Sequence, residues 1–596
     1  MSDHRPIVAL GFSPEALPLL ERLAQSLAIA DLRRPGAQAP EPGPWLAQRW
    51  SGARAVLAVG ACGLVTRLVA PLLGDKTKDP AVLVIDPPGR FVVPLLGGHG
   101  AGGEALAEEI AALLGATAVL TGAAASAGRL PLDSFARAWG WRRGDGDWHS
   151  LMQHAGRGEP VVGVRQQSGQ DLWRQLDAAR GLDPLVEGGD PPAELVISSR
   201  IGPGCRWHPP CLWLGMGCER DTSPSLLERL VDDTLHRHGL AAEAVAGLAS
   251  AGRKGDEAAL LALSHRRGWP LRLYDETALA AVVVPNPSAA VAAEMGTASV
   301  AEAAAMLAAG TGSHLVIEKI IGRATAAERG AATLAVAEAL QPWAPARGAL
   351  HLVGSGPGAL TLLTPEARAA LARCCVWVGY GPYLDLLEPL RRPHQLRRDG
   401  RLTAELERCR EAIALARQGV QVALISSGDS GIYGMAGLAL ELWLGLAPDD
   451  RPPFQVHPGV SALQLAAARA GAPLMHDFCT ISLSDRLTPW DVIEGRLRAA
   501  AAGDFVVALY NPRSADRHWQ LERARQLLLA GRGPATPVLI ARQLGRPEET
   551  TSLHTLGSLP VEAVDMLTLV LVGNSATKEK DGWMVTPRGY PGAELS

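Results

Sequence analysis

The most chemically informative stretch of the chain places one carboxylate in a run of small residues. Residues 424–435 read LISSGDSGIYGM, so Asp429 follows an apolar strand and is flanked by Gly428 and Ser430. Small residues let the backbone approach a ligand closely, while the carboxylate can accept hydrogen bonds from ribose hydroxyls or an ammonium group. The pattern is typical of a loop that binds a small molecule.

Four other segments repeat the pattern of an apolar strand that breaks into a turn. They read GSGPG at 354–358, HPGVSA at 457–462, LYNPRS at 509–514 and TLVLVGNS at 568–575. In an α/β sheet, such loops gather at the carboxyl edge of the strands, where these folds bind ligands. The five loops together therefore predict one binding site.

The elements that position these loops predict a multi-domain α/β chain. Strand-like and helical runs alternate before about residue 200, again after 211, and again after 349, with breaker-rich residues at 201–210. We predict α/β domains at 1–200 and 211–325, a linker at 326–348 that includes an alanine-rich helix, and a last domain at 349–590. Ser461 and Thr364 are the expected N-caps of two helices in that last domain.

Composition excludes several classes of function. The 596 residues are too many for a single core, and a net charge of −4 gives no footprint for nucleic acid or an anionic membrane. No run approaches the ~20 apolar residues that span a bilayer, and the first residues lack a signal-like apolar region, so we expect a cytoplasmic protein. The eight cysteines lack paired C-x-x-C spacing, so neither a metal site nor a disulfide framework is expected.

The motifs GSGPG, SGDSGIYGM, PGVSA, LYNPR and LVLVGNS, in this order over 349–590, resemble the tetrapyrrole methyltransferase family. Within that family they are similar to the precorrin-3B C(17)-methyltransferases of cobalamin synthesis. The resemblance implies two α/β subdomains with a cleft that binds S-adenosyl-L-methionine in a folded conformation. It also implies methylation of precorrin-3B at C-17 with ring contraction to precorrin-4, and a homodimer.

Carried over position by position, the resemblance implies a cofactor pocket and a substrate trough. The cofactor pocket would comprise Gly428, Asp429, Ser430, Tyr433, Ser461, Ala462, Tyr510, Asn511 and Thr568. The trough would be lined by Gly354, Ser355, Gly356, Pro357, Gly358 and Arg513. An arginine fork suits the acetate and propionate carboxylates of a tetrapyrrole, whether or not that substrate carries cobalt.

Two side chains in these loops are candidates for acid–base chemistry. Methyl transfer from a sulfonium needs positioning and a dry cleft more than a strong base, so no triad is expected. The implied ring contraction requires loss of a proton, for which Asp429 and His457 are the candidates. The alternative for Asp429 is a structural cofactor anchor, and the alternative for His457 is a capped or solvated imidazole.

The front of the chain resembles the cobalt-precorrin-5A hydrolases of the same pathway. Residues 59–82 and 93–103 are similar to their amino-terminal domain, and 215–304 to their carboxyl-terminal domain. That resemblance implies lactone opening on a macrocycle, which needs an activated water and anchors for a polyanion. The candidate side chains are Arg67, Lys76, Asp79 and His99.

Two departures from the hydrolase pattern leave the role of the front half open. The chain reads GGEA at 102–105 where relatives have asparagine after Gly-Gly-Ala, and TGA at 121–123 where they have Thr-Thr-Ala. A polar loop has thereby lost an amide and a hydroxyl. One interpretation is a hydrolase whose activity dominates, and the other is a non-catalytic module that binds or scaffolds a tetrapyrrole.

Overall fold

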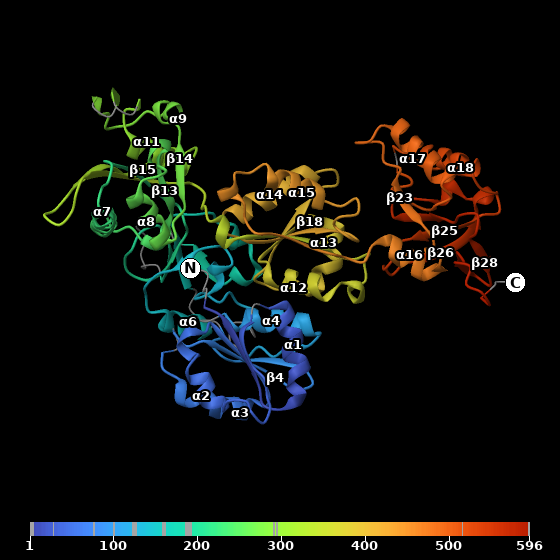
Figure 1. The fold of residues 1–596 in the computed structure, drawn as a ribbon, viewed down its shortest axis with the longest axis horizontal. Coiled ribbons are helices and arrows are strands. Elements are labelled where there is room, and N and C mark those ends of the chain that lie inside the picture. The colour runs from blue at the N-terminus through green and yellow to red at the C-terminus, as the bar shows by residue number, and fades with distance from the viewer. Residues whose placement is uncertain are drawn as a thin grey trace.

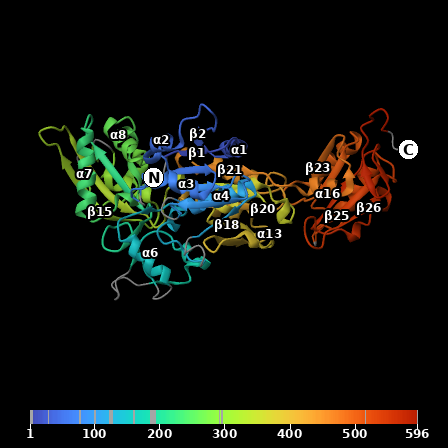
Figure 2. The same ribbon diagram turned by 90° about the horizontal axis from the view of Figure 1, so that it is seen from below.

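The computed structural model describes residues 5–27, 29–75, 78–98, 102–121, 128–157, 162–184, 194–289, 292–293, 296–514 and 516–593. Strands in these ranges form six sheets, which confirms a multi-domain α/β chain. The sheets of residues 212–338 and 478–572 lie toward opposite ends of the molecule in both views (Figures 1 and 2). No helix in the described ranges is long and apolar enough to cross a membrane.

The first sheet has the order β2-β1-β3-β4-β5-β6 and carries helices on both faces. Along β1, Ile7 and Ala9 pack in one apolar cluster, while Val8 and Leu10 pack in another on the opposite face. A strand buried on both faces must be apolar throughout, which explains the continuous apolar run. Its elements are β1 (Ile7–Gly11), α1 (Leu17–Ser26), β2 (Ile29–Arg33), α2 (Pro42–Ala47), β3 (Ala55–Val59), α3 (Cys62–Val69), β4 (Ala81–Ile85), β5 (Phe91–Leu96), α4 (Gly103–Leu114) and β6 (Thr117–Ala118).

A second sheet, with the order β7-β11-β10-β8-β9, follows within the segment predicted as one domain. Its last strand falls in residues 201–210, which read as a linker. Trp207 explains the strand, because its indole is fully buried and donates a hydrogen bond to the Leu132 carbonyl at 2.8 Å. The elements are β7 (Arg142–Arg143), α6 (Trp148–Arg157), β8 (Val162–Gln166), β9 (Leu182–Pro184), β10 (Leu195–Ile197) and β11 (Cys205–His208).

The third sheet has the order β14-β13-β12-β16-β15. Residues 331–338 lie in the segment predicted as a linker with a helix, yet they form β16 between β12 and β15. Alanine favours helix, but pairing on both sides and burial outweigh that weak propensity. The elements are β12 (Leu212–Cys218), α7 (Pro224–Arg237), β13 (Val245–Ala251), α8 (Ala258–Arg267), β14 (Leu271–Tyr274), α9 (Glu276–Ala280), α11 (Val300–Ala309), β15 (His314–Arg323) and β16 (Ala331–Glu338).

The fourth sheet is fully parallel, with the order β19-β18-β20-β17-β21. The ends of β17 and β20, which carry two of the predicted glycine loops, are therefore adjacent at one edge. The elements are β17 (Ala349–Gly354), α12 (Pro365–Arg373), β18 (Val376–Tyr380), α13 (Gly381–Leu387), β19 (Leu396–Gly400), α14 (Glu405–Arg417), β20 (Gln421–Ser426), α15 (Ala436–Leu444) and β21 (Phe454–His457).

The fifth sheet is mixed, with the order β23-β24-β27-β25-β26, and a small sheet β22-β29-β28 lies beside it. The fourth and fifth sheets are the two subdomains expected for the last domain. The elements are α16 (Ala462–Ala470), β22 (Gly471–Ala472), β23 (Phe478–Ser482), α17 (Trp490–Ala502), β24 (Val506–Tyr510), α18 (Gln520–Leu529), β25 (Pro537–Arg542), β26 (Thr550–Thr555), β27 (Thr568–Val572), β28 (Lys578–Lys580) and β29 (Trp583–Val585).

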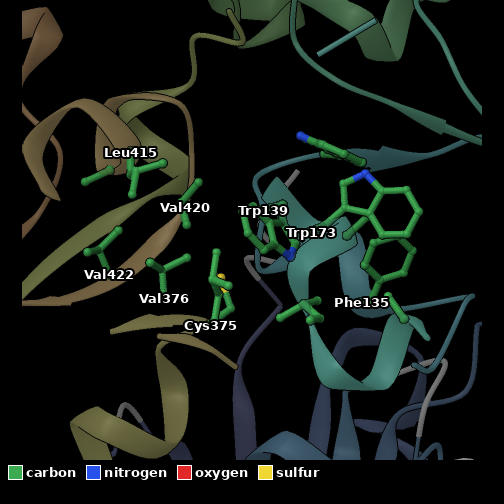
Figure 3. Packing of buried hydrophobic residues seen from close by; sticks show 14 of the residues in the cluster. Phe135, Trp139, Trp173, Cys375, Val376, Leu415, Val420 and Val422 are labelled. Atoms are coloured by element: carbon green, nitrogen blue, oxygen red, sulfur yellow. The ribbon is translucent and has the colours of Figure 1, made fainter. Parts of the chain in front are cut away.

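One hydrophobic core joins the second sheet to the fourth. Phe135, Trp139 and Trp173 pack in the same buried cluster as Cys375 and Val420 (Figure 3). The backbones are also tied, since Gln421 N donates to the Ala138 carbonyl at 3.1 Å and Ala178 N donates to the Pro393 carbonyl at 2.9 Å. The predicted domain boundaries stay a prediction. Separating the residues before 200 from those after 349 would divide this core between two pieces.

Candidate functional site

A cavity of about 200 Å³ lies between the fourth and fifth sheets, and we call it the glycine-loop cavity. Four of the predicted loops contribute to its wall, whereas the fifth segment contributes Thr568 from the start of β27. β27 runs antiparallel to its neighbours, so the turn after it lies at the other end of the strand, where Ser575 donates to Asp504, and the expectation that this loop joins the site is wrong. The predicted cofactor residues that line it are Gly428, Asp429, Tyr433, Ser461, Ala462, Tyr510, Asn511 and Thr568, and Pro357 joins them from the predicted substrate loop. Residues far apart in the sequence thus meet at one site.

Glycines allow three of these loops to touch. Gly356 and Gly428 pair as an isolated antiparallel bridge, in which each backbone N–H donates to the carbonyl of the other, at 3.1 and 2.8 Å. A Cβ atom built on Gly354 would lie 2.6 Å from Gly459 N and 2.8 Å from Gly428 O. Side chains cannot occupy that space, so the glycines are required by contact between backbones.

Asp429 organises the loops around the cavity. Its Oδ1 accepts a hydrogen bond from Gly431 N at 2.9 Å, and its Oδ2 accepts one from Gly459 N at 3.0 Å. The carboxylate therefore joins the second loop to the third. A carboxylate has about four lone-pair sites, so it can still accept hydrogen bonds from a ligand.

Two tyrosines form an aromatic wall across the two subdomains. The rings of Tyr433 and Tyr510 lie 5.1 Å apart, and the Tyr433 hydroxyl donates to the Thr480 carbonyl at 3.0 Å. Tyr433 and Asn511 both adopt positive φ, at 53° and 51°, which is uncommon for residues with side chains. Such strained backbone is concentrated at ligand sites, and here it turns Tyr433 toward the fifth sheet.

The remaining cofactor candidates lie at the start of α16 and β27. Ser461 caps α16, because its hydroxyl accepts from Gln464 N at 3.2 Å while Gln464 accepts from Ser461 N at 2.8 Å. This confirms the predicted N-cap, as does the Thr364 cap of α12. The Thr568 hydroxyl donates to Asp565 Oδ1 at 2.6 Å.

Ser430 lies beneath the cavity wall. It is fully buried, and its hydroxyl has no hydrogen-bond partner among the described residues. A buried polar group without a partner is costly, so it indicates a polar ligand atom or a small backbone adjustment on binding. Together with the aromatic pair and the Asp429 carboxylate, this residue set fits a cationic nucleotide sulfonium.

Two predicted site residues lie elsewhere. His457 is buried behind the third loop, where its Nδ1–H donates to Glu366 at 2.8 Å and its Nε2 accepts from His351 Nδ1 at 2.9 Å. Burial lowers the pKa of His457, which keeps the ring neutral. Arg513 donates to the Val561 carbonyl at 3.1 Å and pairs with Glu562, so it does not line the cavity.

The first loop extends from the cavity toward the fifth sheet. Pro357 lines the cavity, whereas Ser355 is buried and its hydroxyl donates to the Gly356 carbonyl at 3.3 Å. A Cβ atom on Gly358 would lie 2.7 Å from Gly545 O and 2.8 Å from Arg546 Cγ. This loop therefore touches the turn after β25.

That turn, helix α13 and the residues just before β27 supply cavity residues that the sequence analysis did not assign to the site. The missed residues include Tyr383, Gln543, Leu544, Arg546, Met566 and Leu567. The guanidinium of Arg546 has no hydrogen-bond partner in the described chain, in contrast to Arg513. The available signal was the apolar run at 537–541 followed by Gly545, which repeats the strand-then-glycine pattern of the other loops.

A larger cavity of about 1040 Å³ lies where the first and second sheets meet, and we call it the junction cavity. Asp79 lines it, and its carboxylate accepts hydrogen bonds from Trp50 Nε1 at 3.1 Å and Gly74 N at 3.0 Å. Arg67 is exposed on α3, where it donates to the Gly63 carbonyl, and it does not line the cavity. Lys76 and His99 lie outside the described residues.

Three segments of the chain match models of known families. Residues 349–560 match the family model of tetrapyrrole (corrin/porphyrin) methylases, 212–337 match "Cobalamin synthesis G C-terminus", and 44–125 match "Cobalamin synthesis G N-terminal".

Two relatives and one solved structure cover the last domain. A probable cobalt-factor III C(17)-methyltransferase of Salmonella typhimurium is 49% identical over 241 residues, which are 40% of this chain and 99% of the relative. A precorrin-3B C(17)-methyltransferase of a Sinorhizobium species is 43% identical over 252 residues, covering 41% and 98%. The crystal structure of the methyltransferase CobJ is 40% identical, covers 40% of this chain and all of its own, and has a TM-score of 0.39.

Nearly the full length of a relative is matched at 49% identity, and the matched region contains the glycine-loop cavity. The chain therefore belongs to the tetrapyrrole (corrin/porphyrin) methylases, and it carries two cobalamin synthesis G segments ahead of its methylase segment.

Proposed function

We propose that the last domain methylates precorrin-3B or cobalt-factor III at C-17, with ring contraction, in cobalamin biosynthesis. The observation that carries the proposal is the convergence of four predicted loops and the start of β27 on the glycine-loop cavity. The names of the Salmonella and Sinorhizobium relatives support the position of methylation, since both are C(17)-methyltransferases. S-adenosyl-L-methionine, when bound, supplies an activated methyl group on a sulfonium.

Side chains around the cavity would hold this cofactor by complementary charge and shape. Asp429 accepts ribose hydroxyls or the ammonium group with the lone pairs that the two backbone amides leave free. Tyr433 and Tyr510 present aromatic rings to the cationic sulfonium. Ser430 offers its unpartnered hydroxyl, and Ser461, Ala462, Asn511 and Thr568 complete the wall.

Arg546 is the arginine we assign to the substrate in place of Arg513. It lines the cavity beside Pro357 and Tyr383, and its guanidinium is free to pair with an acetate or propionate carboxylate. Arg513 instead pairs with Glu562. Positioning of the macrocycle against the cofactor then provides the rate enhancement that methyl transfer needs.

Asp429 is also the acid–base candidate that borders the cavity. His457 is separated from the cavity by the loop that it supports, so we assign it a positioning role. Its neutral ring holds the turn whose Gly459 N–H binds Asp429.

The decisive experiment incubates the full chain with S-adenosyl-L-methionine and either precorrin-3B or cobalt-factor III. Mass spectrometry should show a gain of one methylene unit, and NMR should place the new methyl at C-17. The Asp429→Asn variant turns an amide N–H₂ toward a backbone N–H, so cofactor affinity should fall about 10-fold or more in calorimetry. The exposed Asp449→Asn variant is the matched control. No mass gain with either substrate would refute the proposal.

A second function, hydrolysis by the front half of the chain, is favoured by the junction cavity. At about 1040 Å³ it is large enough for a macrocyclic ligand, and Asp79 borders it. We propose that this half hydrolyses an ester or lactone. The alternative of a non-catalytic carrier predicts binding of a carboxylated macrocycle without turnover.

A further inference from the structure

The junction cavity is assembled from segments that are distant in the sequence. The first sheet contributes Asp79 and Gly97, the turn after β7 and helix α6 contribute residues 143–149, and β11 contributes Arg206 and His208. A wall made from both sheets holds its shape only when the two sheets are docked. This arrangement is that of a ligand site between domains.

His208 presents an imidazole nitrogen to this cavity in a defined state. The side chain is 2% exposed, and its Nδ1 lies 2.7 Å from the Ser198 carbonyl oxygen. A carbonyl can only accept, so Nδ1 carries the proton and Nε2 has a free lone pair. Burial lowers the pKa of His208 below its ordinary 6.5, against the opposing effects of the Ser198 carbonyl and Glu243. The ring is therefore neutral and basic at Nε2.

Nε2 of His208 has no hydrogen-bond partner in the described part of the chain. Its close neighbour is Gly144, where a built Cβ atom would lie only 2.3 Å from Nε2. The imidazole therefore packs against Gly144, and only a glycine leaves room for the ring at this position. Oδ1 of Asp133, on the same cavity wall, is also buried without a partner. Both unpaired acceptors border the cavity, so each can accept a hydrogen bond from a bound water.

Two arginines at the cavity are available to bind a carboxylate of a ligand. Arg143 stacks over Trp148 with its guanidinium carbon 4.7 Å from the ring centroid, and Arg206 donates to the Pro203 and Arg200 carbonyls at 3.2 and 3.0 Å. In the described chain neither guanidinium is paired with a carboxylate. Both line the cavity, as do the carboxylates of Asp79, Asp133, Asp145, Asp147 and Glu243. A carboxylate of a ligand would therefore be held locally by the two arginines and not by the overall charge of the cavity.

The described residues that line the cavity include no serine, threonine, cysteine or lysine. Cys205 is close by in sequence, but burial raises the pKa of its thiol to about 11, so it is not a thiolate nucleophile at neutral pH. With no hydroxyl, thiol or amine beside it to activate, a neutral histidine at this cavity would act on a water. The chemistry that remains is direct hydrolysis.

We propose that the junction cavity is a second active site, in which His208 is the general base for water attack on an ester or lactone that bears carboxylates. This assignment rests on the hydrolytic function proposed above. The water oxygen bonds to the carbonyl carbon as its proton passes to Nε2. The bond between that carbon and the alcohol oxygen then breaks, and the proton on Nε2 passes to the leaving alkoxide. Asp133 orients the water, while Arg143 and Arg206 hold the carboxylates of the substrate.

The test uses the full chain and the 4-nitrophenyl monoester of succinic acid, followed by release of nitrophenolate. His208→Gln should lower the rate about 100-fold or more, which is the usual contribution of a general base. Gly144→Ala keeps the imidazole but places a methyl group against Nε2, so it should cause a similar loss. His236→Gln, on the exposed face of α7, is the matched control and should leave the rate unchanged.

Substrate charge is tested with 4-nitrophenyl acetate, which lacks the carboxylate. The parent should prefer the succinate ester, and the Arg143→Gln/Arg206→Gln variant should lose that preference through a higher KM with little change in kcat. Methyl transfer by the same preparations reports folding, because the second sheet shares its core with the methylase domain. If His208→Gln also loses methyl transfer, that variant is misfolded, and the ester hydrolysis rate of Gly144→Ala then tests the role of His208.

The outcomes separate the two proposals. No turnover of the ester by the parent would overturn both the hydrolytic function and the base. Turnover by the parent that persists in a folded His208→Gln or Gly144→Ala variant would overturn the assignment of His208 alone. Turnover without a preference for the carboxylated ester would overturn the role of the two arginines.

Discussion

Contacts of single backbone atoms decide the shape of the glycine-loop cavity. Gly354, Gly428 and Gly459 come so close that a methyl group on the first would meet backbone atoms of the other two. Backbone cannot move aside as a flexible side chain can, so the three positions act together. The Asp429 carboxylate then fastens the same junction through Gly459 N.

Gly354→Ala should therefore lower cofactor affinity more than it lowers stability. The added Cβ atom would lie 2.6 Å from Gly459 N, which pushes the third loop away from Asp429. Isothermal titration calorimetry with S-adenosyl-L-methionine measures the effect. Gly437→Ala on α15 is the control, since nothing lies within 4 Å of its Cβ position and alanine favours a helix. Equal affinity of the two variants would contradict this account.

Buried histidines should make the protein sensitive to mild acid. Burial lowers the pKa of His351 from 6.5 to about 3, so below pH 6.5 the unfolded chain takes up a proton that the folded chain refuses. Stability should fall as the pH drops from 6.5 toward 3, and His351→Gln should flatten that slope. Chemical denaturation across this pH range measures it, with exposed His314→Gln as the control. If the free energy of unfolding falls with pH at the same slope in the parent and in His351→Gln, the lowered pKa of His351 would be contradicted.

Helix α16 illustrates how one element serves both fold and site. Its capping box of Ser461 and Gln464 satisfies amides at the helix start, and the same serine borders the cavity beside Tyr510. The Tyr510 hydroxyl accepts a hydrogen bond from Leu463 N in the first turn. The helix start is thus held from two sides and positions the third loop.

Ser461→Ala should cost about 1 kcal/mol of stability, the usual value of a lost N-cap, and should also weaken cofactor binding. Ser299→Ala removes the equivalent cap of α11 in the third sheet's layer, far from the cavity in sequence and element order. That control should lower stability by a similar amount and leave affinity unchanged. Thermal unfolding and calorimetry together distinguish the two. An unaffected affinity in Ser461→Ala would remove this residue from the pocket.

The shared core makes the front of the chain part of the methylase fold. Trp139 lies 1% exposed in the cluster that also holds Val376 and Val420. Outside that cluster, Arg373 of α12 pairs with Glu109 of α4 at 2.7 Å, so the first sheet's layer is tied to the fourth as well. Relatives that consist of a methylase domain alone lack these contacts. In this chain, the apolar side chains on that face of the methylase domain are buried by the front of the chain.

Trp139→Ala should therefore destabilise the methylase domain although it lies more than 200 residues before it. Removing a buried tryptophan typically costs about 3–5 kcal/mol. Methyl transfer after mild heating should be lost together with tertiary structure, in one transition measured by calorimetry and by activity. Trp583→Ala, whose side chain is 60% exposed, is the control. Independent melting of the methylase domain in Trp139→Ala would contradict a common core.

Local patterns were sufficient to determine much of this protein. Apolar runs and helix caps such as Ser461 and Thr364 are set by neighbouring residues, so the α/β class and the strand-end loops could be predicted from sequence. Eight of the nine predicted cofactor residues line one cavity, and seven of them lie at or just after the carboxyl ends of β20, β21 and β24. Thr568 is the exception, because it begins β27, which runs antiparallel to β24 and β25.

Other features depend on contacts between segments that are distant in sequence. Only folding revealed that Arg546 borders the cavity while Arg513 pairs with Glu562, since the partner of an arginine is set by tertiary packing. Burial between two strands likewise outweighed the helix propensity of residues 331–338. The junction cavity and the shared core arise from surfaces of separate sheets. No local pattern encodes their meeting, because the free energy that joins them comes from burying both surfaces at once.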